Sequence, residues 1–343
     1  MSADTQTLDE AAVSAYLETH LPGFEGPMEV TKFQTGQSNP TFLLKTPTHA
    51  YVLRRKPPGV LLKSAHAVDR EFRVQSALAG SDVPVAKMHL LCEDDDVIGS
   101  MFYVMDHVPG RNFGDPSMPG LTPADRGAVI DEMNRVLAAL HSVDIGAVGL
   151  SDYGPEGNYF ERQVGRWSKQ YRASETVSIP AMDKLMEALV AERPEDDGQR
   201  TLVHGDYRID NMIFDAESTA CRAVLDWELS TTGHPFADLA AVIMQWQMPA
   251  GDEGRGMGGL DREALGLPSD RAFIEAYCAR RGLSEIDHFG YYLAFCFFRM
   301  AAIIQGVLKR ALDGNASNPE RAKQLGQYVP VFAQHGLDAL KRG

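Results

Sequence analysis

The chain has 343 residues, of which 44% are hydrophobic and 23% charged, a composition typical of a globular protein and not of a disordered or fibrous one. Its 33 Lys and Arg residues against 47 Asp and Glu residues give a formal net charge of -14, which disfavours partners such as nucleic acid or an anionic membrane surface. The four cysteines lie far apart and form no CxxC pair, so they indicate neither a zinc site nor a disulfide framework.

The N-terminal part of the sequence is expected to be mostly β. Residues 8–21 place apolar side chains near helical spacing and predict a short amphipathic helix. Between residues 28 and 105, turn residues separate the strand-like runs MEVTKF, TFLLKT, AYVLRRK, VAKMHLLCE and MFYVM, and a helical segment at 65–79 follows the third run. The acidic start of the chain lacks the basic start and apolar core of a signal peptide, so we expect a cytoplasmic protein.

Helices dominate the pattern beyond about residue 121. Thr122, Pro123 and Asp125 are the residue types of an N-cap, a first-turn proline and a capping acid for a helix over 122–143. Further helices are predicted at 158–173, 180–192, 235–247, 270–282, 286–312 and 319–341. Only 202–214 and 221–229 have strand patterns in this part, and they predict one short β-ribbon.

Two segments of the C-terminal part have unusual compositions. The most apolar window, 289–308, contains Arg299 and Gln305. It falls short of an uninterrupted span of about 20 apolar residues and therefore predicts a buried core helix and no membrane span. The glycine-rich segment 251–266 predicts a mobile surface loop, and the sequence leaves open whether this loop closes over a substrate.

Residues 202–214, LVHGDYRIDNMIF, place charged and amide side chains inside an apolar frame. Phosphoryl transfer needs a carboxylate that orients or deprotonates the attacking hydroxyl, and oxygen ligands that hold magnesium against nucleotide phosphates. His204, Asp206 and Asn211 keep the spacing of the kinase catalytic loop H-R-D-x-x-x-x-N. We therefore expect Asp206 to be the catalytic base and Asn211 a metal ligand, with His204 in a supporting, structural role.

A second carboxylate follows in 223-AVLDWEL-229, where Asp226 comes after three apolar residues. Inside such an apolar run a charge is unfavourable unless a cation or hydrogen-bond donors lie beside it. The alternative interpretation is that Asp226 is an ordinary acidic residue of a turn. Oxygen ligation by Asn211 and Asp226, with positions left for phosphates and water, suits Mg²⁺. The sequence thus predicts a magnesium site that uses Asn211 and Asp226.

The motifs HGDYRIDN, LDWE and GHPFADLA resemble those of the aminoglycoside phosphotransferase and choline kinase family of protein-kinase-like small-molecule kinases. The segments 36-GQSNPTF-42, 52-VLRRKPPG-59 and 65-AHAVDREFRV-74 are similar to the kinase-like domain that some acyl-CoA dehydrogenases carry. The resemblance covers most of the chain. It implies an α+β, bilobal protein-kinase-like fold, with an N-terminal antiparallel sheet lobe that has one key helix and spans 1–107, and a larger, mainly helical lobe over 108–343 that carries catalysis and substrate binding.

The resemblance also implies roles for individual residues around the nucleotide. Arg54, which shares a strand face with Val52, falls where kinases place a phosphate-binding Lys, and Glu71 in the following helix would pair with it. The alternatives are an ordinary basic strand end and a solvated helix carboxylate. Arg208 would meet the transferred phosphate, and Asp238 would brace the catalytic loop. The remaining nucleotide-binding positions implied are Gly36, Gln37, Ser38 and Asn39 in the loop over the phosphates, and Met105, Asp106 and Val108 in the linker beside the adenine.

The function predicted from these residues is Mg²⁺-dependent transfer of the γ-phosphate of ATP or GTP to a hydroxyl of a small molecule. A nucleotide-binding pseudokinase without transfer activity is the alternative from another class, because the glycine-rich loop keeps only Gly36 and Arg54 replaces Lys. Protein kinase activity is disfavoured, since no APE-like segment follows Asp226. The oligomeric state, the number of magnesium ions and the preference for ATP or GTP stay open.

The phosphate acceptor is predicted less directly. Residues 270–343 contain ten Lys and Arg against seven Asp and Glu, a local charge of +3 that favours an anionic acceptor. The resemblance to the dehydrogenase-associated domain points to hydroxyacyl thioesters of coenzyme A. An aminoglycoside, macrolide or choline-type acceptor is the alternative.

Overall fold

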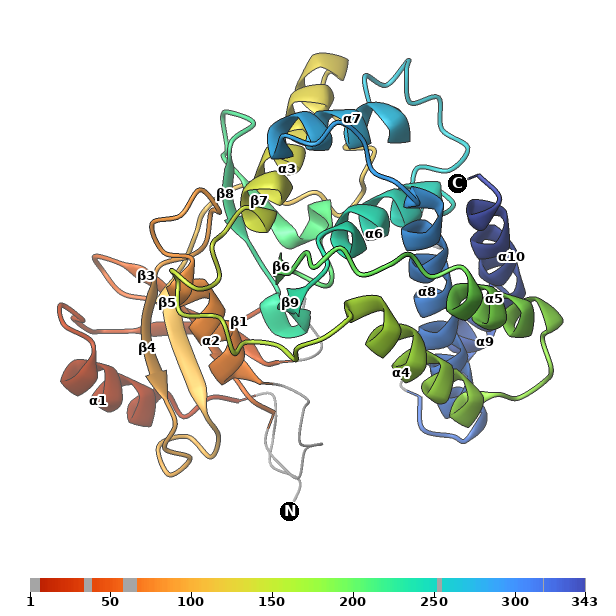
Figure 1. Ribbon diagram of the computed structural model, residues 1–343. Helices are drawn as coiled ribbons and strands as arrows, with labels where there is room; N and C mark the ends of the chain where they lie inside the picture. Colours follow the sequence, from red (N-terminus) through yellow and green to blue (C-terminus); the bar gives the residue numbers. More distant parts are fainter. Residues whose placement is uncertain (1–6, 34–38, 58–66, 252–254, 317, 343) are drawn as a thin grey trace. The chain divides into compact units, whose positions relative to one another are not determined.

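The computed structural model describes residues 7–33, 39–57, 67–251, 255–316 and 318–342 (Figure 1). The chain divides into two compact units. The first consists of Met1–Asn112, Ala147–Leu150 and Asn211–Ser230, and the second of Phe113–Gly146, Ser151–Asp210 and Thr231–Gly343. The sequence division at 107/108 had assigned 147–150 and 211–230 to the C-terminal lobe, whereas the structure groups these segments with the N-terminal part of the chain.

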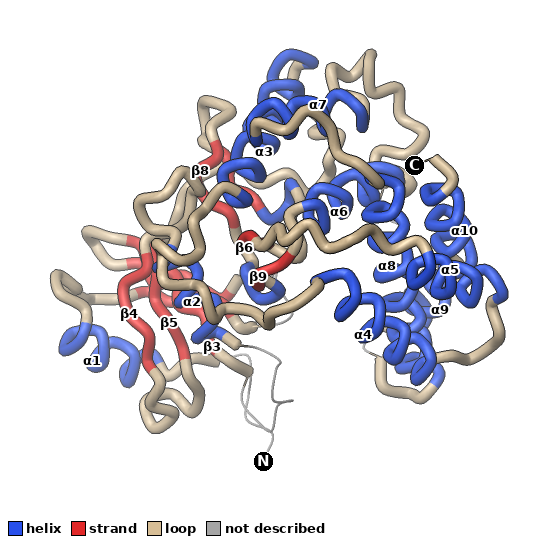
Figure 2. The backbone as a smooth tube through the Cα atoms, viewed as in Figure 1, coloured by secondary structure: helices blue, strands red, loops and turns tan. Residues whose placement is uncertain are grey.

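A five-stranded antiparallel sheet, coloured red in Figure 2, forms the centre of the first unit, with strand order β1-β2-β3-β5-β4. Its strands are β1 (Glu29–Lys32), β2 (Thr41–Lys45), β3 (Ala50–Arg55), β4 (Met88–Cys92) and β5 (Phe102–Asp106). The helix α1 (Glu10–His20) precedes the sheet and α2 (Val68–Ala77) lies between β3 and β4 in the chain. These elements confirm the strand and helix assignments made for this part of the sequence.

The helices α1 and α2 pack on opposite faces of the sheet. Val13 and Leu17 of α1 share one hydrophobic cluster with Phe102 and Val104 of β5. Tyr103, which lies between these two strand residues, instead contacts α2 through its hydroxyl group. Because successive side chains of a strand point to opposite faces, α1 covers one face and α2 the other.

A short hairpin completes the first unit. The strands β7 (Met212–Phe214) and β8 (Cys221–Val224) pair antiparallel, with Met212 opposite Val224. A turn of 3-10 helix, η1 (Ile209–Asn211), leads into β7, and another, η2 (Trp227–Leu229), follows β8. The hairpin therefore brings residues 211 and 225–226 to the same end.

The second unit is mainly helical. Its helices are α3 (Pro123–His141), α4 (Tyr159–Ser174), α5 (Pro180–Ala191), α6 (Phe236–Gln247), α7 (Asp270–Arg281), α8 (Phe289–Leu312), α9 (Pro319–Gly326) and α10 (Val329–Leu340). The long helix α8 packs against α4, α6, α9 and α10. Thr122 caps α3 by accepting a hydrogen bond from the Asp125 N–H at 3.2 Å, with Pro123 in the first turn, as the sequence predicted. By length and composition α8 could cross a membrane, but 67% of its most apolar window is buried inside the structure, as in a core helix.

Two sequence expectations need correction. The ribbon expected from 202–214 and 221–229 is present only in part, as the β7–β8 hairpin. The start of the first segment belongs instead to β6 (Thr201–Val203), which pairs with β9 (Thr231–Gly233), a strand that the sequence pattern did not reveal. The helix expected over 319–341 is two helices separated at 327–328. Pro330 lies in the first turn of α10 and has no N–H to continue a helix from the preceding turn, which explains the break.

Candidate functional site

The expected catalytic loop, His204 to Asp206, begins where β6 ends in the second unit. Gly205 has a φ of 82°, a backbone conformation that glycine adopts without the steric cost of a side chain. His204 is completely buried, and its Nδ1 accepts a hydrogen bond from the Asp206 N–H at 3.3 Å. This hydrogen bond ties the His204 ring to the backbone of the loop.

Asp238, in the first turn of α6, holds the backbone of this loop. Its Oδ2 accepts a hydrogen bond from the His204 N–H at 2.6 Å and its Oδ1 accepts one from the Gly205 N–H at 2.9 Å. From the other side, Arg299 of α8 donates to the Gly205 carbonyl at 2.8 Å. The brace expected of Asp238 is thus present in the structure, while the contribution of Arg299 was not anticipated.

Electrostatics keep Asp238 ionised although it is only 2% exposed. Burial by itself would raise its pKa, but the hydrogen bond and charge of His141 and the N–H of His204 bring the pKa below its ordinary value. His141 Nε2 lies 3.5 Å from Asp238 Oδ2, and its Nδ1 lies 2.7 Å from the hydroxyl oxygen of Tyr277. Burial lowers the pKa of His141 below its ordinary value, although Asp238 acts in the opposite direction.

Arg208 lies two residues beyond Asp206, and its guanidinium is paired with Asp210. Its Nε donates to Asp210 Oδ1 at 2.6 Å, and its Nη2 contacts Asp210 Oδ2. Arg255 lies 3.6 Å from the same carboxylate oxygen. In this structure Arg208 is therefore held by a neighbouring acid, and its contact with a transferred phosphate stays a prediction.

The two expected metal ligands belong to the first unit and come to the same end of the β7–β8 hairpin. Asn211 directly precedes β7, and its carbonyl accepts a hydrogen bond from the Leu225 N–H at 2.8 Å. Asp226 follows with a φ of 64° and a ψ of 60°, the left-handed region that costs a non-glycine residue roughly 1–2 kcal/mol. Such strain is typical of functional positions, and it turns Asp226 out of the strand that precedes it.

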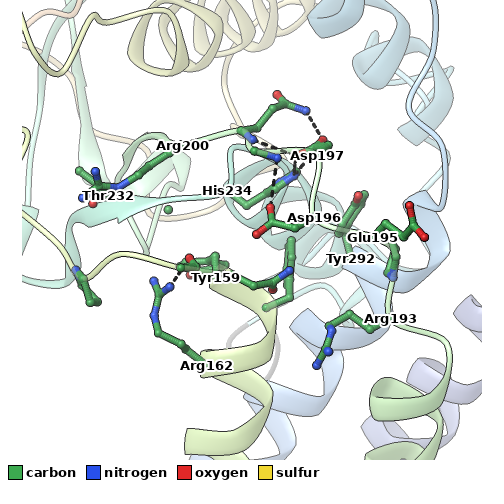
Figure 3. A pocket seen from close by; sticks show the side chains of 18 residues that line it. Tyr159, Arg162, Arg193, Glu195, Asp196, Asp197, Arg200, Thr232, His234 and Tyr292 are labelled. Atoms are coloured by element: carbon green, nitrogen blue, oxygen red, sulfur yellow. Dashed lines mark hydrogen bonds and ion pairs between the residues drawn. The ribbon is translucent and has the colours of Figure 1, made fainter.

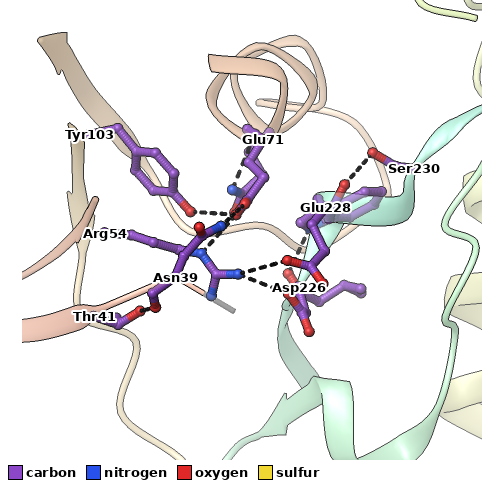
Figure 4. Close-up of polar contacts among 11 residues, drawn as sticks. Asn39, Thr41, Arg54, Glu71, Tyr103, Asp226, Glu228 and Ser230 are labelled. Atoms are coloured by element: carbon purple, nitrogen blue, oxygen red, sulfur yellow. Dashed lines mark hydrogen bonds and ion pairs between the residues drawn. The ribbon is translucent and has the colours of Figure 1, made fainter. Parts of the chain in front are cut away.

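Asp226 belongs to a network centred on Arg54, shown in Figure 4. Arg54 Nη2 donates to Asp226 Oδ1 at 3.0 Å and lies 3.7 Å from Glu228 Oε2. Arg54 Nε lies 3.0 Å from Glu71 Oε2, but its N–H is not aligned with that oxygen, so the contact is an ion pair and not a hydrogen bond. The ion pair predicted between Arg54 and Glu71 is therefore present, and Arg54 is also the cation that pairs with the partly exposed Asp226.

Glu71 is almost completely buried, at 1% exposure, and has two further donors. Asn39 Nδ2 donates to its Oε1 at 2.9 Å, and the Tyr103 hydroxyl donates to its Oε2 at 3.0 Å. Burial raises the pKa of Glu71, and Arg54 and Tyr103 limit the rise. For Arg54, burial alone would lower the pKa, but Glu71 and the neighbouring acids raise it above its ordinary value, and we take the pair to be charged.

The sequence did not identify Tyr103 and Glu228 as members of this network. Tyr103 is the β5 residue directly opposite Arg54 in the sheet register, so strand pairing could have suggested it. Glu228 lies two residues after Asp226, inside the LDWE motif. Asn39, which was expected in the phosphate loop, here helps to hold Glu71, and its contact with phosphate stays a prediction.

Replacing Glu71 with Ala is expected to lower the free energy of unfolding by about 3–5 kcal/mol, as for a broken buried ion pair. The truncation removes the buried ion-pair partner of Arg54 and the acceptor of the Asn39 and Tyr103 hydrogen bonds. Glu71→Gln keeps the size and one acceptor oxygen and should cost less. Urea unfolding of both variants followed by circular dichroism measures the difference, and equal stability of Glu71→Ala and the unchanged protein would contradict a structural role for the pair.

The other predicted nucleotide-binding residues are only partly described. Gly36, Gln37 and Ser38 lie outside the described residues. Met105 and Asp106 end β5, and Val108 follows two residues later. Their contact with an adenine stays a prediction, and the side chain of Asp106 has other partners, which are considered below.

A cavity of about 190 Å³ lies in the second unit (Figure 3). Its walls include Arg162, Arg193, Arg200, Asp197, His234 and Tyr292. Arg200 directly precedes β6 and His234 directly follows β9, whereas Asp206 lies beyond the opposite end of β6. A three-residue strand spans about 10 Å, so the cavity and Asp206 lie at opposite ends of this strand pair, and we assign the cavity no part in the reaction at Asp206.

Comparison with known proteins identifies relatives along the whole chain. The model of the phosphotransferase enzyme family matches residues 29–278. The mouse protein acyl-CoA dehydrogenase family member 10 is 45% identical over 342 residues, which cover 99% of this chain and 32% of that protein. The chain thus spans about a third of the length of this relative.

Solved structures give the same result for the fold. The structure of a candidate aminoglycoside phosphotransferase from Ralstonia eutropha is 48% identical, with a TM-score of 0.90, and the match covers 98% of this chain and 99% of that one. The aminoglycoside phosphotransferase APH(4)-Ia, in a ternary complex with AMP-PNP and hygromycin B, is 17% identical with a TM-score of 0.61 over 95% of this chain and 99% of that one. These comparisons confirm both resemblances found in the sequence. The chain belongs to the phosphotransferase enzyme family and has its α+β, bilobal protein-kinase-like fold.

Proposed function

We propose that this phosphotransferase moves the γ-phosphate of ATP, or of GTP, to a hydroxyl group of a small molecule, with Asp206 as the base. The observation that carries the proposal is the fixed backbone around Asp206. The N–H groups of His204 and Gly205 are bound by Asp238, and the Gly205 carbonyl is bound by Arg299. A carboxylate on such a loop is positioned before substrate binds, which is where catalysis by orientation gains most.

The chemistry assigned to Asp206 is simple. Its carboxylate accepts the proton of the acceptor hydroxyl while that oxygen forms a bond to the γ-phosphorus. The bond between the γ-phosphorus and the bridging oxygen breaks, and the nucleoside diphosphate leaves. Use of ATP is supported by the AMP-PNP bound to the fold neighbour APH(4)-Ia.

Asn211 and Asp226 would hold magnesium in this reaction. The test of fit is the donor set: an asparagine and an aspartate lie at the same end of one hairpin, and the Asp226 side chain is 36% exposed. Oxygen donors of this kind suit Mg²⁺, which would screen the negative charge of the phosphates. Arg54, held by Glu71, would supply a further positive charge for the nucleotide.

For the acceptor we propose hydroxyacyl thioesters of coenzyme A. One support is the identity of 45% with a protein named as an acyl-CoA dehydrogenase family member. The other is the local charge of +3 in residues 270–343, which contain ten Lys and Arg and seven Asp and Glu. Phosphorylation would convert the hydroxyl of such a thioester into a better leaving group.

The test is mass-spectrometric detection of phosphorylated acceptor after incubation with Mg-ATP. The panel contains 3-, 4- and 5-hydroxyacyl-CoA compounds, aminoglycosides, macrolides, choline and homoserine, and Asp206→Asn is the control. We expect a new phosphate on a hydroxyacyl-CoA that is lost in the control. Phosphate on an antibiotic or amino alcohol alone would overturn the acceptor class, and tight nucleotide binding without any transfer would favour a pseudokinase.

A further inference from the structure

Two histidines and an aspartate meet on the face of the five-stranded sheet that is covered by α1, away from the Arg54 network. His49 Nε2 lies 2.9 Å and His89 Nε2 lies 2.5 Å from Oδ1 of Asp106. The three potential ligand atoms all lie within 4.8 Å of one another. None of the three is used by the proposed reaction through its side chain.

The sheet itself explains why these side chains converge. Tyr51 is directly opposite Asp106 in the pairing of β3 and β5, and His49 precedes Tyr51 by two residues, so all three side chains share a face. In the pairing of β4 and β5, the register shifts between Met88 and Leu90. His89 is the extra residue of this bulge, and a bulge re-aims a side chain, here toward Asp106.

Neighbouring groups hold the two imidazoles. The Tyr51 ring packs against His49 at 4.3 Å between centroids and against His89 at 5.3 Å. The turn that carries His49 is closed by hydrogen bonds between Thr46 and His49, including the His49 N–H to Thr46 Oγ1 at 3.1 Å. This packing favours the ring orientations in which both Nε2 atoms point toward Asp106.

The chemistry of the donor set selects the ion. Two imidazole nitrogens and one carboxylate oxygen suit Zn²⁺ and similar borderline transition-metal ions, whereas Mg²⁺ and Ca²⁺ prefer oxygen alone. Tetrahedral zinc with bonds near 2.0 Å separates its ligand atoms by about 3.3 Å. The distances of 2.9 and 2.5 Å to Asp106 Oδ1 would therefore have to widen by less than about 1 Å, and the 44% exposed side chain of His49 has room to move.

We propose that His49, His89 and Asp106 form a binding site for a divalent transition-metal ion, with zinc as the preferred ion and one coordination position open to water. The site joins three neighbouring strand segments at one end of the sheet, where β5 ends and β3 begins. Metal binding there stabilises the first unit, because an ion that binds only the folded state shifts unfolding by mass action. The inference is independent of the proposed phosphoryl transfer.

The test uses the full chain, freed of metal by a chelator and titrated with Co²⁺ while visible absorption is recorded, followed by displacement with Zn²⁺. We expect one Co²⁺ per chain, without the charge-transfer band of a thiolate ligand, and a thermal unfolding midpoint that rises by a few degrees with Zn²⁺. His49→Ala and His89→Ala should each weaken binding at least about tenfold, and the double variant should abolish it. His49 is exposed, so its replacement leaves the fold intact.

His20→Ala is the matched control, because it removes an exposed histidine of the same unit that lies outside the cluster. It should bind Co²⁺ as tightly as the unchanged protein. The proposal is overturned if the unchanged protein binds neither ion at micromolar concentration, or if the double variant binds as well as His20→Ala does.

Discussion

Replacing Asp206 with Asn is expected to slow phosphoryl transfer by about 10²–10⁴-fold, the contribution of a positioned general base. The amide cannot accept the proton of the attacking hydroxyl, but it has nearly the same size as the carboxylate. The backbone of the loop is held by Asp238 and Arg299 and does not depend on the Asp206 side chain. Nucleotide affinity should therefore change little.

Single-turnover kinetics with the acceptor found in the panel, together with calorimetric titration of ADP, would measure both effects. Asp215→Asn is a matched control, since this carboxylate caps the turn of the β7–β8 hairpin by accepting from the Glu217 and Ser218 N–H groups. It should keep the transfer rate within a few-fold. A normal rate in Asp206→Asn would show that another group is the base.

The use of Arg at position 54, where the family resemblance led us to expect Lys, follows from the carboxylates around it. Arg54 meets Glu71 through Nε and Asp226 through Nη2, so two atoms of one planar guanidinium reach acids from a helix and from the segment after β8. A lysine has a single ammonium group and could not span both in this way. The departure from the usual residue is thus compatible with an ordered nucleotide site and gives no support to the pseudokinase alternative.

The features predictable from the sequence were those that depend on local spacing. The helix cap at Thr122 depends on residue types within one helical turn, and the strand face shared by Val52 and Arg54 depends on the two-residue period of a strand. Both features are present in the structure. The loop of His204 and Asp206 was recognisable for the same reason, since its spacing lies within one short segment. Local patterns encode these features directly.

Features that depend on contacts between distant segments were missed. The strand β9 has only three residues, Thr231–Gly233, and exists because β6 lies beside it. Arg299 reaches Gly205 across 94 positions of the chain, and Asp106 meets His49 across 57. No periodicity marks such pairs, so only the folded structure reveals them.

Replacing Asp238 is expected to lower the free energy of unfolding as much as Glu71→Ala does, and to slow the reaction as well. Its buried carboxylate accepts from the His204 and Gly205 N–H groups, and Asp238→Ala would leave both donors without an acceptor, at a cost of about 3–5 kcal/mol in the free energy of unfolding. Asp238→Asn keeps one acceptor oxygen but turns an NH₂ group toward the other backbone donor, so it should cost nearly as much. Both variants should also lower the transfer rate, because Asp206 would no longer be held in place.

The pH dependence of this loss tests the electrostatic reason for it. The folded pKa of Asp238 lies below its ordinary value, because the favourable contacts with His141 and the His204 N–H outweigh the cost of burial. Its stabilising contribution is therefore fully present above the unfolded pKa of about 4 and is lost as the pH falls below that value. Urea unfolding between pH 7 and pH 3 measures the difference in free energy of unfolding between the unchanged protein and Asp238→Asn. This difference should become smaller as the pH falls. Asp131→Asn, which removes an exposed carboxylate paired with Arg280, should show almost no difference at pH 7. A difference for Asp238→Asn that stays constant down to pH 3 would mean that the charge of Asp238 does not hold the loop.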